Sequence, residues 1–219
     1  MKNKKTLYFV LMFLPLIITL VVLPFLPEQI PAHYNFAGEI DRWGSKYETL
    51  LFPAITILMG FFMLWMAKIA AKQEGSGNNN EKIVFYTGMG ISLWFTAMHT
   101  FSLYKAFAAA GSMGFAHESD INQLICVLLG ISMMITGNFM PKLRNNGIIG
   151  LRTPWSMKND TVWKKCQLFG GISFIVCGVL MIIAGIFIEG YTAMCIALGL
   201  LIVDTVVCVI YSYKISKKY

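Results

Sequence analysis

Charged residues are scarce in this chain of 219 residues, since Asp, Glu, Lys and Arg together make up 13% of it, about half the share usual in soluble domains. Acidic residues are the scarcest, with 11 against 18 basic ones. Hydrophobic residues make up 57%, and the mean hydropathy is +0.64. This composition excludes a soluble globular domain and indicates an integral membrane protein.

Residues that hold metals or form disulfides are also few. The 5 cysteines lie within apolar runs or beside Lys164 and Lys165, at spacings that match no zinc site. We therefore interpret them as packing residues without a disulfide framework. The 3 histidines lack a ligand spacing such as His-Glu-x-x-His. We expect no catalytic residue, no metal and no cofactor.

Apolar runs of about 20 residues, long enough to cross roughly 30 Å of hydrocarbon as a helix, occur repeatedly. They cover residues 7–26, 50–71, 83–104, 121–140, 168–188 and 191–211. None alternates between polar and apolar residues, so helices are expected and barrel strands are not. No small-residue cleavage pattern follows the first run, which we interpret as a retained helix. We predict an all-α, polytopic membrane protein with six transmembrane helices.

The basic residues predict the orientation, because Lys and Arg are retained on the cytoplasmic side. With the N-terminus inside, every basic residue except Arg42, Lys46 and Lys105 lies on the inner side. Both termini are therefore predicted to be cytoplasmic. The net charge of +7 is then an inner charge, which indicates contact with anionic lipid and no direct binding of nucleic acid.

The polar stretch 72–82 divides the chain, since its Gly, Ser and Asn residues predict a flexible cytoplasmic linker. Residues 1–71 form a two-helix N-terminal unit with a patterned extracellular loop at 27–49. Two prolines and several glycines in that loop predict a folded cap. Residues 83–219 form a four-helix unit with a cytoplasmic elbow at 141–167.

Small and polar residues within the runs predict how the helices pack. Gly171, Gly178 and Gly185 recur every seven residues, which is typical of a close helix seam. His99 is interpreted as a hydrogen-bonded packing residue near the outer end of its helix. Asp204 must be neutral or paired inside the membrane. The partners that we expect to reach it are Arg144, Arg152 and Asn138.

Two motifs resemble known families. The outer loop carries Ile30-Pro31, His33, Asn35, Gly38-Glu39 and residues 41–46, and it resembles a membrane-associated domain of unknown function that commonly precedes SdpI-type proteins. The inner elbow resembles the core signature of the SdpI family itself. Its matching residues are Gly137-Asn138, Met140-Pro141-Lys142, Arg144, Asn146, Gly150, Arg152-Thr153-Pro154-Trp155 and Trp163-Lys164-Lys165. The two resemblances together span most of the chain.

The resemblance implies a bacterial plasma-membrane protein that protects its producer from a secreted killing peptide. It also implies a receptor that holds a transcriptional repressor at the membrane when the toxin is present. The partners expected are thus the lipid bilayer, an extracellular peptide toxin and a cytoplasmic repressor. For the toxin we predict a site at His33, Asn35, Asp41 and Trp43. For the repressor we predict a site at Asn138, Pro141, Arg144, Arg152, Thr153, Pro154, Trp155 and Trp163.

Other interpretations of these residues stay open. The elbow is equally interpreted as a membrane anchor, with Trp155 and Trp163 at headgroup depth and lysines reaching phosphates. Asp160 is expected to cap a helix that continues through Trp163 into the fifth span. An outward-facing metal-dependent enzyme would use the histidines with acidic residues of the same side. A small secondary transporter would use His99 and Asp204 as coupling residues.

Overall fold

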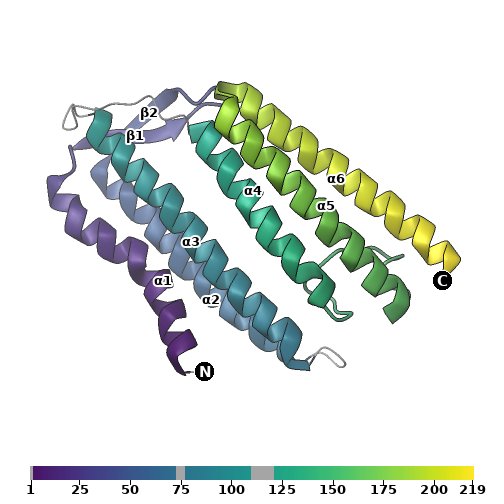
Figure 1. Ribbon diagram of the computed structural model, residues 1–219. Helices are drawn as coiled ribbons and strands as arrows, with labels where there is room; N and C mark the ends of the chain where they lie inside the picture. Colours follow the sequence, from purple (N-terminus) through teal and green to yellow (C-terminus); the bar gives the residue numbers. More distant parts are fainter. Residues whose placement is uncertain (1, 73–76, 110–120) are drawn as a thin grey trace. The chain divides into compact units, whose positions relative to one another are not determined.

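A computed structural model describes residues 2–72, 77–109 and 121–219 (Figure 1). Long helices dominate the chain, so the predicted all-α, polytopic class is confirmed. The helices are α1 (Lys2–Val22), α2 (Leu51–Lys72), α3 (Gly77–Ala109), α4 (Ile121–Phe139), α5 (Asp160–Phe187) and α6 (Gly190–Lys218). Short elements between them are η1 (Leu23–Phe25), β1 (Gln29–Tyr34), β2 (Ile40–Ser45), η2 (Lys46–Leu50) and η3 (Met140–Lys142).

Within the described ranges, 5 helical segments are long and apolar enough to cross a membrane. They are Asn3–Phe25, Lys46–Lys72, Ile121–Lys142, Asp160–Phe187 and Gly190–Lys218. Helix α3 has the length, but Ser, Thr, Asn and His side chains spread along it dilute its apolar character. A count of six spans and the orientation therefore stay predictions.

Helix α3 begins at Gly77, so residues 77–82 are helical where the sequence predicted a flexible linker. The reason is that the side chains of Asn79 and Asn80 form hydrogen bonds with backbone groups more than 60 residues away in sequence. The Asn79 amide donates to the carbonyl oxygen of Lys142 at 2.7 Å. The Asn80 amide donates to the Arg144 carbonyl and accepts from the Arg144 amide, both at 3.2 Å. Residues 73–76 of the predicted linker lie outside the described residues.

Packing divides the chain into two compact units, Met1–Met63 with Gly88–Ile121 and Leu64–Thr87 with Asn122–Tyr219. Helices α2 and α3 each contribute one part to each unit. In the first unit, Tyr8 donates its hydroxyl to the carbonyl of Gly60 at 2.8 Å and joins α1 to α2. The second unit holds α4, α5 and α6 together with the elbow.

The contact between α4 and α5 is the close seam that the glycine spacing predicted. A Cβ at Gly178 would lie 2.5 Å from the carbonyl oxygen of Gly130, and a Cβ at Gly130 would lie 2.5 Å from that of Gly178. About two turns further along α4, a Cβ at Gly137 would lie 2.5 Å from the Gly171 carbonyl oxygen. Only glycine allows backbones to approach this closely.

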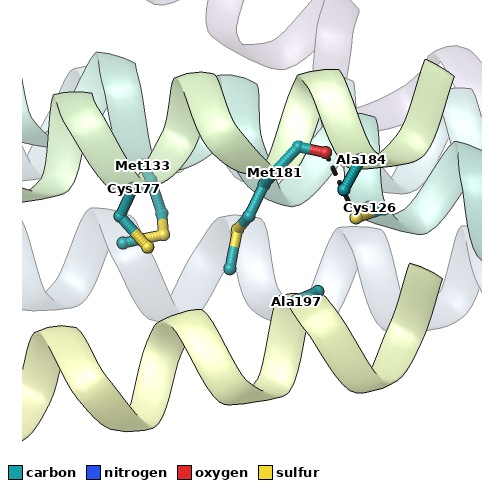
Figure 2. Packing of buried hydrophobic residues seen from close by; sticks show 6 residues of the cluster. All are labelled: Cys126, Met133, Cys177, Met181, Ala184 and Ala197. Carbon is teal, nitrogen blue, oxygen red and sulfur yellow. Dashed lines mark hydrogen bonds between the residues drawn. The ribbon is translucent and has the colours of Figure 1, made fainter. Parts of the chain in front are cut away.

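Sulfur-containing side chains fill the space beside this seam (Figure 2). Cys126, Met133, Cys177, Met181, Ala184 and Ala197 of α4, α5 and α6 form one buried cluster. The Cys126 thiol donates to the Met181 carbonyl oxygen at 3.3 Å. The flexible thioethers suit an irregular space between helices whose backbones are close.

Candidate functional site

The segment between α1 and α2 forms an antiparallel hairpin, hereafter the hairpin (residues 28–48), which gives the predicted cap its structure. Strands β1 and β2 pair Pro31 with Trp43 and His33 with Arg42, with register shifts on both sides of His33. The base of the hairpin is anchored because Ile30 packs in a buried cluster with residues of α1 and α3. We predicted a folded cap and did not identify the strand pairing, because Pro31 and the shortness of the two segments weaken the sequence pattern of a hairpin.

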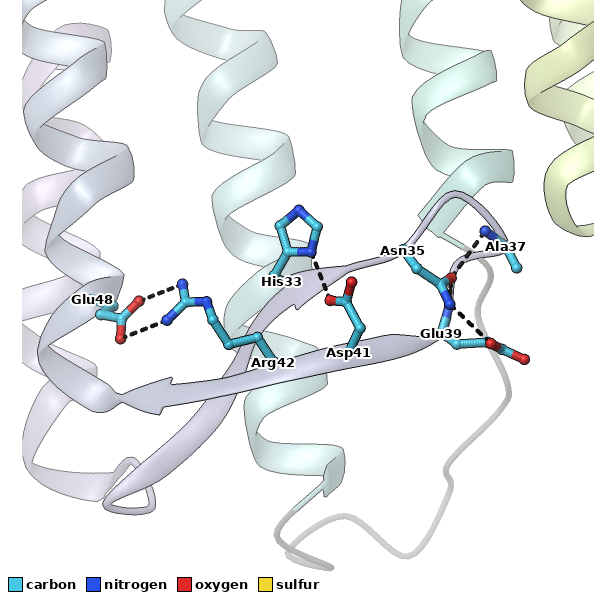
Figure 3. A network of polar contacts seen from close by, with 7 residues as sticks. All are labelled: His33, Asn35, Ala37, Glu39, Asp41, Arg42 and Glu48. Carbon is cyan, nitrogen blue, oxygen red and sulfur yellow. Dashed lines mark hydrogen bonds and ion pairs between the residues drawn. The ribbon is translucent and has the colours of Figure 1, made fainter.

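Asn35 closes the turn of the hairpin (Figure 3). Its side-chain oxygen accepts from the backbone amides of Ala37 at 2.9 Å and Glu39 at 3.0 Å. Its amide group donates to the Glu39 carboxylate at 2.9 Å. Gly38 supplies the left-handed conformation of the turn, with φ of 87°. Asn35 is therefore occupied with the turn itself.

Ion pairs between Arg42 and Glu48 and between Lys46 and Glu28 tie the hairpin together. The Arg42 guanidinium contacts the Glu48 carboxylate through two hydrogen bonds of 3.2 and 2.8 Å (Figure 3). The hydrogen bond and charge of Glu48 raise the pKa of Arg42. Lys46 donates to Glu28 at 2.8 Å.

The predicted toxin-site residues lie in this hairpin. The register shift beside His33 allows its Nδ1 to lie 2.6 Å from the Asp41 carboxylate, and both side chains remain accessible. Trp43 lies two positions further along β2, with half of its surface exposed. The hairpin thus joins His33 to Asp41 and leaves the Trp43 ring accessible, while Asn35 serves the turn.

The second site is the elbow, predicted at residues 141–167. Residues 160–167 belong to α5, so the segment between α4 and α5 is residues 140–159, and the name elbow hereafter means that segment. Its first part is fixed by buried contacts, because the Trp163 indole donates to the Leu143 carbonyl at 2.8 Å. Trp163 is 1% exposed and packs with Ile83, Met140 and Leu143. Its ring thus supports the elbow from inside and is inaccessible to a soluble partner.

The middle of the elbow is held by two buried amides. The Asn146 side-chain oxygen accepts from the backbone amides of Ile148 and Ile149, both at 2.8 Å. Gln167 of α5 pairs with Leu151, accepting from its amide and donating to its carbonyl at 3.0 Å each. A Cβ at Gly150 would lie 2.6 Å from the Gln167 oxygen, and the φ of Gly150 is 110°. This explains the glycine and the asparagine in the signature.

The last part of the elbow binds the end of α6. The Thr153 hydroxyl donates to Ser212 at 3.0 Å. Thr153 and Ser156 also exchange two backbone-to-side-chain bonds of 2.8 and 2.9 Å. Lys158 donates to the Ser216 carbonyl at 2.7 Å, where a cation suits the C-terminal end of a helix. Asn159, one residue before the predicted Asp160, caps α5 by accepting from Val162.

The other predicted partner residues divide into two groups. The Arg152 guanidinium donates to the carbonyl of Gly147 and so closes the elbow. Trp155 keeps 38% of its surface exposed while its ring meets Tyr213 edge-on at 5.2 Å. The remaining exposed residues of the predicted site are Asn138, Pro141, Arg144 and Pro154.

The two intramembrane polar residues lie in different units. His99 is fully buried, and its Nε2 lies 2.7 Å from the Thr19 hydroxyl. Asp204 accepts a hydrogen bond from Ser173 and lies near the Cys208 thiol, at 3.9 Å. These partners are neutral groups, which replace the Arg144, Arg152 and Asn138 that we expected. Sequence reasoning missed Ser173 because nothing in the spacing relates α5 to α6.

A metal site would need several ligands in one place. Within the described ranges, no group of three or more His, Cys, Asp or Glu residues is arranged to hold a metal ion. His117, Glu118 and Asp120, which belonged to the alternative of an outward metal enzyme, lie outside the described residues.

The apolar helices define a multi-pass protein of the bacterial membrane. Comparison with known families then divides the chain as its two motifs suggested. Residues 10–57, which include the whole hairpin, match a domain of unknown function, DUF1648. Residues 142–212 match the SdpI/YfhL protein family. The chain therefore carries an SdpI/YfhL-family domain preceded by a DUF1648 domain, and the predicted resemblance is confirmed.

Similar proteins extend this result over the whole chain. The "Immunity protein SdpI" of Bacillus subtilis (strain 168) is 26% identical over 218 residues, which cover 99% of this chain and 97% of that protein. An uncharacterized protein of Archaeoglobus fulgidus is 39% identical over 44 residues, 20% of this chain and 24% of its own length. No solved structure matches the chain.

Proposed function

We propose that this protein is a non-enzymatic membrane immunity protein that protects its cell from a secreted antimicrobial peptide. The observation that carries the proposal is the similarity to Immunity protein SdpI over 99% of the chain. A match of this extent includes both the hairpin and the elbow, so it supports a shared role for the whole protein and for more than an anchor.

In this proposal the hairpin lies outside the cell and the elbow lies in the cytoplasm. The distribution of Lys and Arg supports that orientation. The hairpin then neutralises or senses the peptide, with His33, Asp41 and Trp43 accessible to it. No reaction is required of such a protein, since binding alone removes the peptide or blocks its action.

The proposal also includes an inner role, in which the elbow holds a soluble transcriptional repressor. Trp155 supports this role, because an exposed Trp packed against Tyr213 is typical of an interface anchor. The Lys217 ammonium lies over the ring of the same Tyr213. Binding outside affects binding inside only if the protein has two states with different affinity for the peptide. Replacing Trp155 with Ala should then abolish repressor recruitment to membranes while protection is retained.

A deletion strain tests the immunity role. We expect cells without the gene to survive poorly in co-culture with the parent strain or in its spent medium, and plasmid-borne wild-type protein to restore survival. Equal survival of the deletion strain and its parent would reject the proposed function. A reporter for genes regulated by the repressor, measured in the same cultures, tests the inner role separately.

A further inference from the structure

The charges of the hairpin do not cancel, although most of them are paired. Arg42 pairs with Glu48, and Lys46 pairs with Glu28. Among the described contacts, Glu39 receives a hydrogen bond from the neutral Asn35 amide, and Asp41 contacts His33, which is charged only when protonated. Asp41 also interacts electrostatically with Arg42, whose guanidinium is already paired with Glu48. With His33 neutral, the hairpin therefore carries excess negative charge, concentrated at its turn end.

Accessible apolar side chains lie near these two carboxylates in sequence. Phe36 is 56% exposed, Ile40 39% and Trp43 50%. Phe36 lies within the turn and the other two lie on β2, on either side of Asp41. These accessible aromatic and aliphatic groups and the two carboxylates lie close together in sequence, at the turn and along β2, and are hereafter called the tip (Phe36, Glu39, Ile40, Asp41 and Trp43).

The tip is held in place by contacts that do not use its recognition groups. The bidentate Arg42–Glu48 pair fixes the base of β2, and Asn35 with Gly38 fixes the turn. Ile30 is buried against helices of the same unit. A surface ordered beforehand loses less conformational entropy when it binds a ligand.

Resting on the proposed function, we propose that the tip docks a cationic, apolar segment of the secreted peptide. Glu39 and Asp41 attract the lysines or arginines of that segment, while Phe36, Ile40 and Trp43 cover its apolar side chains. The membrane surface is the alternative partner for these accessible apolar side chains, and its headgroups are anionic. The excess negative charge of the tip repels such lipids, because charge complementarity decides which partners approach.

The test uses Glu39→Gln/Asp41→Asn, which removes both charges and keeps groups that accept from Asn35 and His33. Glu189→Gln is the matched control, because Glu189 is an exposed carboxylate at the start of α6 whose side chain makes no capping hydrogen bond. The full-length proteins are placed in phosphatidylcholine nanodiscs. The probe is a labelled peptide of alternating lysine and leucine, with a glutamate–leucine peptide as its counterpart.

We expect the lysine–leucine peptide to bind wild type and Glu189→Gln equally, and the double variant at least tenfold more weakly. The glutamate–leucine peptide should bind none of them. Equal binding to all three proteins, or to empty nanodiscs, would assign the probe to lipid and overturn the proposal.

The survival assay separates this inference from the proposed function. In the deletion strain, the double variant should protect at least tenfold less well than Glu189→Gln at equal membrane levels. If the double variant protects fully, the tip proposal fails and the immunity role stands. If the deletion itself has no effect on survival, the immunity role fails, and the nanodisc experiment alone decides whether the tip binds cationic peptides.

Discussion

The seam between α4 and α5 makes a quantitative prediction about helix packing. We consider Gly178→Ala, which places a Cβ 2.5 Å from the carbonyl oxygen of Gly130. Real Cβ atoms essentially never lie closer than 3.0 Å to a heavy atom outside their own residue and its chain neighbours. Because the atom in the way belongs to the backbone, no side-chain rotation relieves the overlap, and the two helices must separate.

Two effects of opposite sign determine the size of the change. Overpacking of a close interface costs about 1–3 kcal/mol. Alanine is the better helix former, so the same substitution stabilises the helix by about 1 kcal/mol relative to glycine. Gly199→Ala isolates the second effect, because no atom lies within 4 Å of a Cβ at Gly199. The difference between the two variants is therefore the overpacking cost alone.

The assay is thermal unfolding of the detergent-solubilised proteins. For a chain of this size 1 kcal/mol corresponds to roughly 2–4 °C, so Gly178→Ala should unfold roughly 2–12 °C below Gly199→Ala. The double variant Gly130→Ala/Gly178→Ala should lose less than the sum of the single changes, because the first separation already makes room for the second methyl. Equal melting temperatures for Gly178→Ala and Gly199→Ala would refute the close seam.

Three further predictions concern the elbow, the buried carboxylate and the hairpin. Gln167→Leu leaves the Leu151 amide without its partner and removes one of two hydrogen bonds to the Leu151 carbonyl, which Ser156 also contacts, so it should lower the free energy of unfolding by about 1–3 kcal/mol in the same assay; an unchanged value would refute the pairing. Asp204→Asn keeps an oxygen that accepts from Ser173 and should unfold within about 1 kcal/mol of wild type, whereas a large loss would indicate that the charge itself is needed. Arg42→Lys removes the bidentate contact with Glu48 and should increase proteolysis within the hairpin without changing global unfolding. Equal cleavage rates for the variant and wild type would show that this ion pair does not order the hairpin.

The helices were predictable because each rests on a local property of its own residues. Apolar runs of membrane-spanning length occur at α1, α2, α4, α5 and α6, and the structure has helices there. The glycine stripe of α5 also predicted a seam. The spacing within α5 does not show which helix packs against it. Gly130 and Gly137 of α4 meet the α5 glycines only in the folded chain.

Two of the misses share one physical cause, which is that a polar side chain can be satisfied by a group far away in sequence. Asn80 looked like part of a flexible linker, and it pairs with Arg144 across 64 residues. Asp204 looked like the partner of a basic residue, and a serine on the neighbouring helix donates to it. In the hairpin, Pro31 argued against a strand because proline has no amide to donate. Both strands of a two-stranded sheet are edge strands, where the missing amide is tolerated.

The elbow shows that a family signature can reflect the residues a fold requires and need not mark a binding site. Asn146 closes its turn, Gly150 leaves room for Gln167, and Trp163 holds Leu143 from inside. These signature residues direct their polar groups into the protein, so their identity follows from the fold of the elbow. A soluble partner would meet a smaller set, in which Trp155 offers the aromatic surface. Variants that test recruitment should therefore change exposed residues such as Trp155, since changing Asn146 or Trp163 would alter the elbow together with anything bound to it.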